Sequence, residues 1–154
     1  ITQEILDDVN PRVSSYSLEP MPWMVPDSPE QYLQLIKDID RPGFSVHLDF
    51  ANMVSSVERY HNAESFIRHC FNLLGPHIRS IHLKDVKLGD ELPCCIREVM
   101  PGNGGLPMNV ALEEAEKLGE DTTVFTEHFD RHEQYVEATA FLRKLGKEMN
   151  INIK

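Results

Sequence analysis

The sequence lacks the features that would point to a membrane, to secretion or to nucleic acid. No apolar run approaches the roughly 20 residues that a membrane span requires, and the first residues do not show the basic, then apolar order of a signal peptide. Lys and Arg number 15 against 25 for Asp and Glu, which gives a formal net charge of −10. Nucleic acids and anionic membranes are bound by clustered cations, so we expect a soluble protein that binds neither.

Cysteine is scarce and is not arranged as a set of metal ligands. The three cysteines, Cys70 and the neighbours Cys94 and Cys95, make an odd number without ligand spacing. This pattern is typical of free thiols in a reducing compartment and predicts a cytoplasmic protein.

What the chain does contain is a regular alternation of β-rich runs and amphipathic helical segments. Strands are expected over 13–19, 44–49, 78–84 and 122–127. Helices are expected over 1–10, after an N-cap at Ser28 with Gln31 completing a capping box, from about 62 to 74, over 110–118, and from a capping box of Asp130 and Glu133 to Gly146. This βα order predicts a parallel sheet in an α/β fold.

Alternation along the strands decides between two parallel-sheet architectures. A doubly wound sheet buries both faces and should read as almost continuous apolar residues. Here one face is apolar, as at Val46 and Leu48, and the other is small or polar, as at His47 and Asp49. A lumen with an active site at its C-terminal mouth explains such strands, so we predict a (β/α)₈ TIM barrel.

Each predicted strand ends in an ionisable side chain. Glu19, Asp49, His82 and Glu127 stand 30, 33 and 45 residues apart (49 − 19, 82 − 49, 127 − 82). One such residue alone is most simply a solvated strand end, but four at matching positions of parallel strands favour a shared site. Three carboxylates and an imidazole suit Mn²⁺, Mg²⁺ or Co²⁺, with Zn²⁺ as an alternative.

Several segments, in order, resemble the xylose-isomerase-like sugar phosphate isomerase/epimerase family. They are Ser-Leu-Glu-Pro at 17–20, His-Leu-Asp-Phe-Ala-Asn at 47–52, His-Leu-Lys-Asp at 82–85, Pro-Gly-Asn-Gly at 101–104 and Thr-Glu-His at 126–128. The resemblance covers nearly the whole chain. It implies that residues 1–154 are a single domain supplying about the last four βα units of the barrel, with the N-terminal half absent.

The resemblance also implies the chemistry. A Glu-Asp-His-Glu quartet, mapped onto Glu19, Asp49, His82 and Glu127, would bind one divalent metal ion, Mn²⁺ first among the candidates. The metal would stabilise the enediolate that forms when a proton leaves the carbon next to a carbonyl. Glu19 and Glu127, on opposite faces of the sugar, would exchange that proton as catalytic base and acid.

Further residues are candidates for substrate binding. Trp23 could form an apolar wall against a sugar, and Asn52 stands where some epimerases of this family have a substrate-contacting histidine. Lys84, Asp85 and Arg97 are candidates to contact substrate oxygens or, for Asp85, to orient a ligand. The full set is Trp23, Asn52, Lys84, Asp85 and Arg97. His47 lies one layer below Asp49, and strict alternation points His128 away from the lumen.

Three readings of the function stay open. The first is a metal-dependent isomerase or epimerase of a free or phosphorylated sugar. The second is a lyase, dehydratase or deglycosidase that uses the same proton abstraction on a keto sugar. The third is a non-catalytic remnant. The apurinic-site endonuclease branch of the family is disfavoured by Asn52 and by the net charge of −10.

The length of the chain also predicts association. A full barrel needs about 250 residues, whereas this sequence has 154. Half a barrel exposes two unpaired strand edges. We therefore expect either a homo-oligomer or association with the missing N-terminal half.

Overall fold

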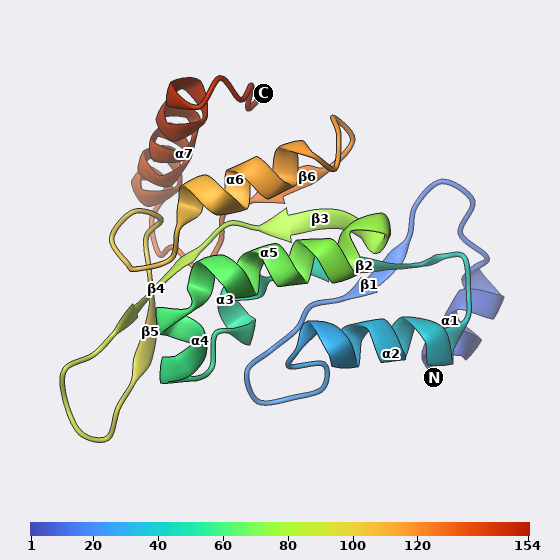
Figure 1. Ribbon diagram of the computed structural model, residues 1–154. Helices are drawn as coiled ribbons and strands as arrows, with labels where there is room; N and C mark the ends of the chain where they lie inside the picture. The colour runs from blue at the N-terminus through green and yellow to red at the C-terminus, as the bar shows by residue number, and fades with distance from the viewer.

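The computed structural model describes all 154 residues, and four of its strands form one parallel sheet (Figure 1). The strand order is β1 (Tyr16–Leu18), β2 (Phe44–Leu48), β3 (Ile78–His82) and β6 (Thr123–Phe125). Every neighbouring pair is parallel. Sequence order equals spatial order, so each helical connection moves the chain one strand further along the sheet. The predicted α/β fold with a parallel sheet is confirmed.

Helices cover one face of this sheet. The five longer helices are α1 (Thr2–Val9), α2 (Pro29–Ile39), α5 (Ala63–Leu74), α6 (Met108–Glu116) and α7 (His132–Glu148). Figure 1 shows α2, α5 and α6 side by side across the sheet. Three short turns of helix were not expected, namely α3 (Phe50–Met53), α4 (Val57–His61) and η1 (Gly75–His77).

The two faces of the sheet differ as the alternation predicts. Val46, Leu48 and Ile81 face the helices and are fully buried in a single hydrophobic core. The intervening residues His47 and His82 lie on the other face and are only partly buried. The polar face is therefore the one that remains available for a site.

The start of α2 follows from its sequence. Ser28 is the N-cap, and its hydroxyl accepts a hydrogen bond from the backbone N–H of Gln31 at 3.3 Å. The Gln31 side chain accepts from the N–H of Asp27 at 3.3 Å, one residue earlier than a capping box requires. The predicted N-cap at Ser28 is confirmed, but the Gln31 side chain accepts from the N–H of Asp27 and not from that of Ser28.

The bounds predicted for α7 are wrong at both ends. The N-cap is Arg131, whose backbone N–H donates to Gln134 Oε1 at 3.0 Å, so the helix begins one residue later than Asp130 and Glu133 indicated. The helix also passes through Gly146 to Glu148. A Cβ at Gly146 would stand 2.9 Å from the Ile153 side chain. This glycine therefore allows the C-terminal segment to pack closely and does not end the helix.

An antiparallel hairpin follows β3 and was not expected from the sequence. It consists of β4 (Asp85–Leu88) and β5 (Ile96–Val99), and it projects from the sheet beside α4 (Figure 1). Its connecting loop carries Cys94 and Cys95, which are both free thiols, as is the buried Cys70. Among the helices, none combines the length and the apolar character needed to cross a membrane.

Candidate functional site

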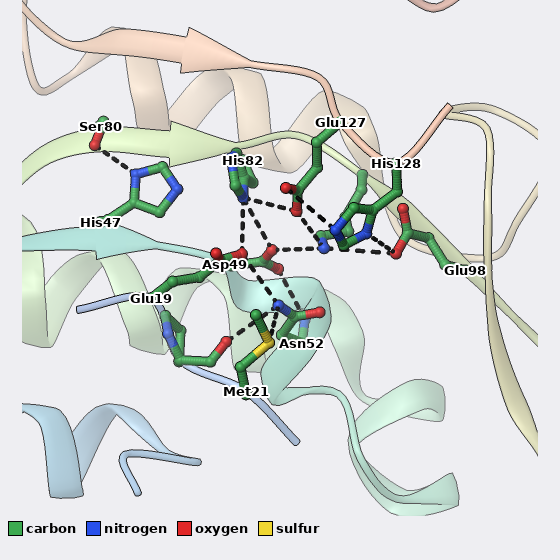
Figure 2. Close-up of polar contacts among 12 residues, drawn as sticks. Glu19, Met21, His47, Asp49, Asn52, Ser80, His82, Glu98, Glu127 and His128 are labelled. Carbon is green, nitrogen blue, oxygen red and sulfur yellow. Dashed lines mark hydrogen bonds and ion pairs between the residues drawn. The ribbon is translucent and has the colours of Figure 1, made fainter. Parts of the chain in front are cut away.

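The ends of the four parallel strands bring the predicted quartet together. One ligand atom each from Glu19, Asp49, His82 and Glu127 lies within 4.8 Å of all the others. Glu19 and Asp49 directly follow β1 and β2, His82 ends β3, and Glu127 comes two residues after β6. Figure 2 shows these side chains pointing toward one another from separate segments. The sheet itself therefore gathers residues that are far apart in sequence.

His82 lies at the centre of the quartet. Its Nδ1 atom is 3.0 Å from Glu19 Oε1, 3.3 Å from Asp49 Oδ2 and 2.8 Å from Glu127 Oε1. The ring of His47 packs edge-on against the ring of His82, with the centroids 4.1 Å apart. His47 Nδ1 is in turn 2.5 Å from Ser80 Oγ. His47 therefore supports His82 from one layer deeper in the sheet.

The pKa shifts reflect three carboxyl groups crowded together. Burial raises the pKa of Glu19, and the charge of Glu127 raises it further. Burial acts to raise the pKa of Asp49, but the hydrogen bond with His82 and the charge of Lys84 outweigh burial, so the pKa is lowered overall. Burial acts to lower the pKa of His82, but the hydrogen bond with Asp49 and the charge of Glu127 outweigh burial, so the pKa is raised overall. The cluster thus favours a positive charge in its midst.

Lys84 supplies one such charge. Its side chain is buried, and Nζ lies 2.9 Å from Asp49 Oδ2, 2.5 Å from Glu127 Oε1 and 3.5 Å from Glu98 Oε2. Burial acts to lower the pKa of Lys84, but the charge of Asp49 and the close Glu127 carboxylate raise it overall. The lysine therefore stays an ammonium ion that neutralises part of the acidic cluster.

The donor atoms fit a divalent metal ion. Glu127 Oε1 is buried and makes no hydrogen bond of good geometry, even though it lies 2.5 Å from the equally buried Lys84 Nζ. A carboxylate oxygen left in that state is the kind of atom that a cation would satisfy. Three carboxylates with one imidazole form a hard ligand set suited to Mg²⁺ or Mn²⁺.

The start of α3 fixes two members of the site. Asp49 is the N-cap of this helix, and its Oδ1 atom accepts from the backbone N–H of Asn52 at 2.8 Å. This leaves Oδ2 facing His82 and Lys84. The Asn52 amide donates to the carbonyl of Pro20 at 3.1 Å and to Glu19 Oε1 at 3.3 Å. Asn52 therefore lies at the quartet and holds the Glu19 segment against β2.

Tyr32 of α2 fixes β1 from the helical side. It is fully buried, its hydroxyl donates to the carbonyl of Leu18, and it accepts from the Leu18 N–H at 3.2 Å. Burial raises the pKa of Tyr32, which keeps the hydroxyl protonated as a donor. Because Leu18 directly precedes Glu19, these hydrogen bonds fix the position of the backbone that carries the first carboxylate of the quartet.

Asp85 and Arg97 are not brought to the quartet. The Asp85 carboxylate accepts hydrogen bonds of 2.9 to 3.1 Å from four backbone N–H groups, those of Val86, Gly102, Gly104 and Leu106. Asp85 therefore anchors the 101–105 loop, and the sequence did not predict this role. Arg97 is exposed on β5 and pairs with Glu91. Since Glu91 lies in the loop between β4 and β5, this ion pair keeps Arg97 at the hairpin loop.

Two residues reach the site that the sequence did not place there: His128, which was expected to point away from the lumen, and Glu98, which was not considered. His128 Nδ1 lies 2.8 Å from Glu98 Oε2, and its Nε2 lies 3.5 Å from Glu127 Oε2. His128 has a positive φ of 60°, so strict alternation fails there and the side chain turns toward the site (Figure 2). Glu98 belongs to the unexpected hairpin. A histidine in the left-handed region is uncommon, and no sequence signal predicts it here.

Trp23 lies beside the quartet on an open hollow. The indole is 78% exposed, and the hollow that it lines has a volume of about 790 Å³. Asn52 and His128, which contact Glu19 and Glu127, also line it, so the hollow lies next to the quartet. A smaller hollow of about 360 Å³ lies at the other end of β6, against the C-terminal segment.

Comparisons with known proteins identify the fold. A family model described as a xylose isomerase-like TIM barrel matches residues 4–145. A comparison with curated protein sequences gives no match. Among solved structures, a xylose isomerase domain protein from Planctomyces limnophilus superposes with a TM-score of 0.73 at 22% identity, covering 97% of this chain and 51% of that chain.

Two further structures share this fold. A xylose isomerase-like TIM barrel protein from Mycobacterium smegmatis in complex with magnesium has a TM-score of 0.70 and 16% identity over 93% of this chain and 47% of that chain. A D-tagatose 3-epimerase-like protein has a TM-score of 0.68 and 22% identity over 96% of this chain and 51% of that chain. The chain thus spans about half the length of the structures it matches, as a partial barrel.

Proposed function

The chain belongs to the xylose isomerase-like TIM barrel family, and from this premise we propose that it is a metal-dependent sugar isomerase or epimerase. The observation that carries the proposal is the convergence of Glu19, Asp49, His82 and Glu127 within 4.8 Å at the ends of four parallel strands. The likeness to a D-tagatose 3-epimerase-like protein and to a magnesium complex supports the same chemistry.

In the proposed mechanism the four residues of the quartet would hold one divalent metal ion, Mg²⁺ or Mn²⁺. When bound, the ion supplies a positive charge that stabilises the oxygen of a carbonyl as the neighbouring carbon loses its proton. Lys84 balances the remaining negative charge of Asp49 and Glu127.

Proton transfer is assigned to Glu19 and Glu127. They follow the first and the last strand of the sheet and approach His82 Nδ1 at 3.0 Å and 2.8 Å. One carboxylate removes the proton from carbon, and the other returns a proton from the opposite face. Asn52 holds Glu19 in place, while His128, itself paired with Glu98, contacts Glu127.

Solvent exchange tests this reaction class. The protein with Mg²⁺ is incubated in deuterated water with a panel of ketoses and 3-keto glycosides, and NMR follows the carbon-bound protons. Incorporation of deuterium without elimination is the expected result. Loss of water or of the aglycone would favour a lyase, and no exchange with any ketose would contradict the proposal.

Metal binding is tested separately by thermal unfolding. At about 100-fold excess over its dissociation constant, a metal that binds only the folded chain contributes about 2.7 kcal/mol. For a chain of this size the Tm should then rise by about 5–10 °C with Mg²⁺ or Mn²⁺ relative to EDTA. The variant Asp49→Asn should lose this rise, whereas Glu120→Gln, which changes an exposed carboxylate far from the site, should keep it. Equal Tm values in metal and EDTA for the unmodified chain would refute the site.

We further propose that residues 1–154 form one domain that is the C-terminal half of a barrel. Strands β1 and β6 are each paired on one side only. An N-terminal half or a second copy of the chain would pair with these edges. Gel filtration distinguishes the two, because a single 17.7 kDa species would contradict self-association.

A further inference from the structure

The open hollow beside the quartet bears on which sugar derivative the site accepts. Its volume of about 790 Å³ lies in the range of ligand pockets, roughly 300–1,000 Å³, and the hollow is open to solvent on one side. It is built by the segments that follow β1 and β2 and by the hairpin that follows β3. Because Asn52 and His128 of this lining contact Glu19 and Glu127, a ligand held at the quartet has room to extend into the hollow.

One wall of the hollow is apolar. Met21, Pro22 and Trp23 line it from the segment after β1, and Val57 and Ile96 line it from α4 and β5. The only tryptophan of the chain is 78% exposed here, and Val57 is 43% exposed. Large exposed apolar side chains gathered at a concave surface indicate a contact with an apolar group.

The charged groups of the hollow do not suit a phosphate. No lysine or arginine lines it, and its one carboxylate, Glu98, pairs with His128 at 2.8 Å. The nearest cations are engaged elsewhere. Lys84 binds Asp49 and Glu127, and Arg97 binds Glu91. A phosphoryl group would therefore meet a carboxylate and apolar side chains in place of a free cation.

A third cation beside the hollow, Arg59, is committed to the backbone. Its Nη1 atom donates to the carbonyl of Met53 at 2.7 Å and to that of Asp27 at 3.0 Å. Its guanidinium also lies over the Phe66 ring, 5.1 Å from the centroid. Turning Arg59 toward a ligand would break all three contacts.

We propose that this site takes an uncharged sugar derivative that carries an apolar, aromatic substituent, and that it discriminates against sugar phosphates. The sugar hydroxyls face Asn52, Glu98 and the quartet, and the aromatic group lies against Trp23. This assignment rests on the proposed function for the direction of the ligand, since the quartet marks the end at which the sugar sits.

The single tryptophan makes the test direct. The full chain with Mg²⁺ is titrated with phenyl β-D-glucopyranoside, methyl β-D-glucopyranoside, glucose and glucose 6-phosphate, and the fluorescence of Trp23 is followed. Stacking of an aromatic group on the indole should make the phenyl glycoside bind at least about tenfold tighter than the methyl glycoside. Glucose 6-phosphate should bind no tighter than glucose.

Variants locate the effect. In calorimetric titrations Trp23→Ala should bring the affinities for the phenyl and methyl glycosides to within about twofold of each other, because the aromatic contact is gone. Val13→Ala, which changes an exposed apolar residue outside the hollow, should keep the tenfold preference. Equal affinities for the two glycosides in the unmodified chain, no saturable binding of the phenyl glycoside, or tighter binding of glucose 6-phosphate would each overturn the proposal.

The outcome is independent of the proposed reaction. These titrations measure binding without turnover, whereas the reaction is tested by solvent exchange. A chain that prefers the phenyl glycoside but exchanges no proton would leave the ligand assignment standing and refute the isomerase. A chain that exchanges protons but does not prefer the phenyl glycoside would support the isomerase and refute the ligand assignment.

Discussion

Replacing Glu127 by Gln should abolish exchange of the carbon-bound proton with solvent while leaving the chain folded. The amide has the shape of the carboxylate but cannot take up the proton, and a general acid or base contributes about 10²–10⁴-fold to a rate. We therefore expect the exchange rate in deuterated water to fall at least about 100-fold. Glu19→Gln should have an effect of the same order, because each carboxylate serves one face of the sugar.

The controls for this experiment separate catalysis from folding. Far-ultraviolet circular dichroism should stay close to that of the unmodified chain, since the amide keeps the shape of the carboxylate and Lys84 keeps its ion pair with Asp49. Glu120→Gln removes an exposed carboxylate that pairs only with Lys154, and it should leave exchange unchanged. Turnover retained in either Glu19→Gln or Glu127→Gln would show that the two carboxylates are not the acid and the base.

The second large effect concerns stability and lies outside the quartet. Asp85→Ala removes the acceptor of four backbone N–H groups, and two of these belong to the buried residues Val86 and Leu106. Hydrogen bonds to a charged group contribute about 1.5–3 kcal/mol each, and buried donors left without partners add a further cost. We expect the free energy of unfolding to fall by about 3–5 kcal/mol.

Equilibrium unfolding in urea measures this loss. Asp90→Ala, at an exposed position of the adjoining hairpin loop, is the matched control and should change the free energy of unfolding by less than about 0.5 kcal/mol. Gly104→Ala should resemble Asp85→Ala, because a Cβ there would collide with Asp85 Oδ1 and the Val86 carbonyl. A small effect of Asp85→Ala would mean that the 101–105 loop does not depend on this carboxylate.

Sequence alternation was enough to predict the sheet and its two faces. The pattern at Val46, His47 and Leu48 reflects a period of two residues, which any strand imposes on its side chains. Because parallel strands end at the same edge, Glu19, Asp49, His82 and Glu127 could be expected to meet before their positions were known. The structure brings these four groups within 4.8 Å of one another, as expected.

Local patterns were less reliable at the ends of helices and beyond the strands. Asp130 and Glu133 fit a capping box, yet Arg131 and Gln134 form the cap. The β4–β5 hairpin was not expected, so Glu98 was not considered for the site and Arg97 was placed too close to it. Such errors arise because a turn or a cap depends on a few contacts that compete closely in energy.

What the sequence alone determined is therefore the α/β fold with its two-faced parallel sheet and the meeting of the four strand-end residues, since both follow from the two-residue period of strands and from their parallel direction. The tertiary structure decided the rest. It turned His128 toward Glu127 through a positive φ, bound Asp85 to the backbone of a distant loop, and set Trp23 on an open hollow. Each of these depends on contacts between segments far apart in sequence, and no local pattern of residues encodes such contacts.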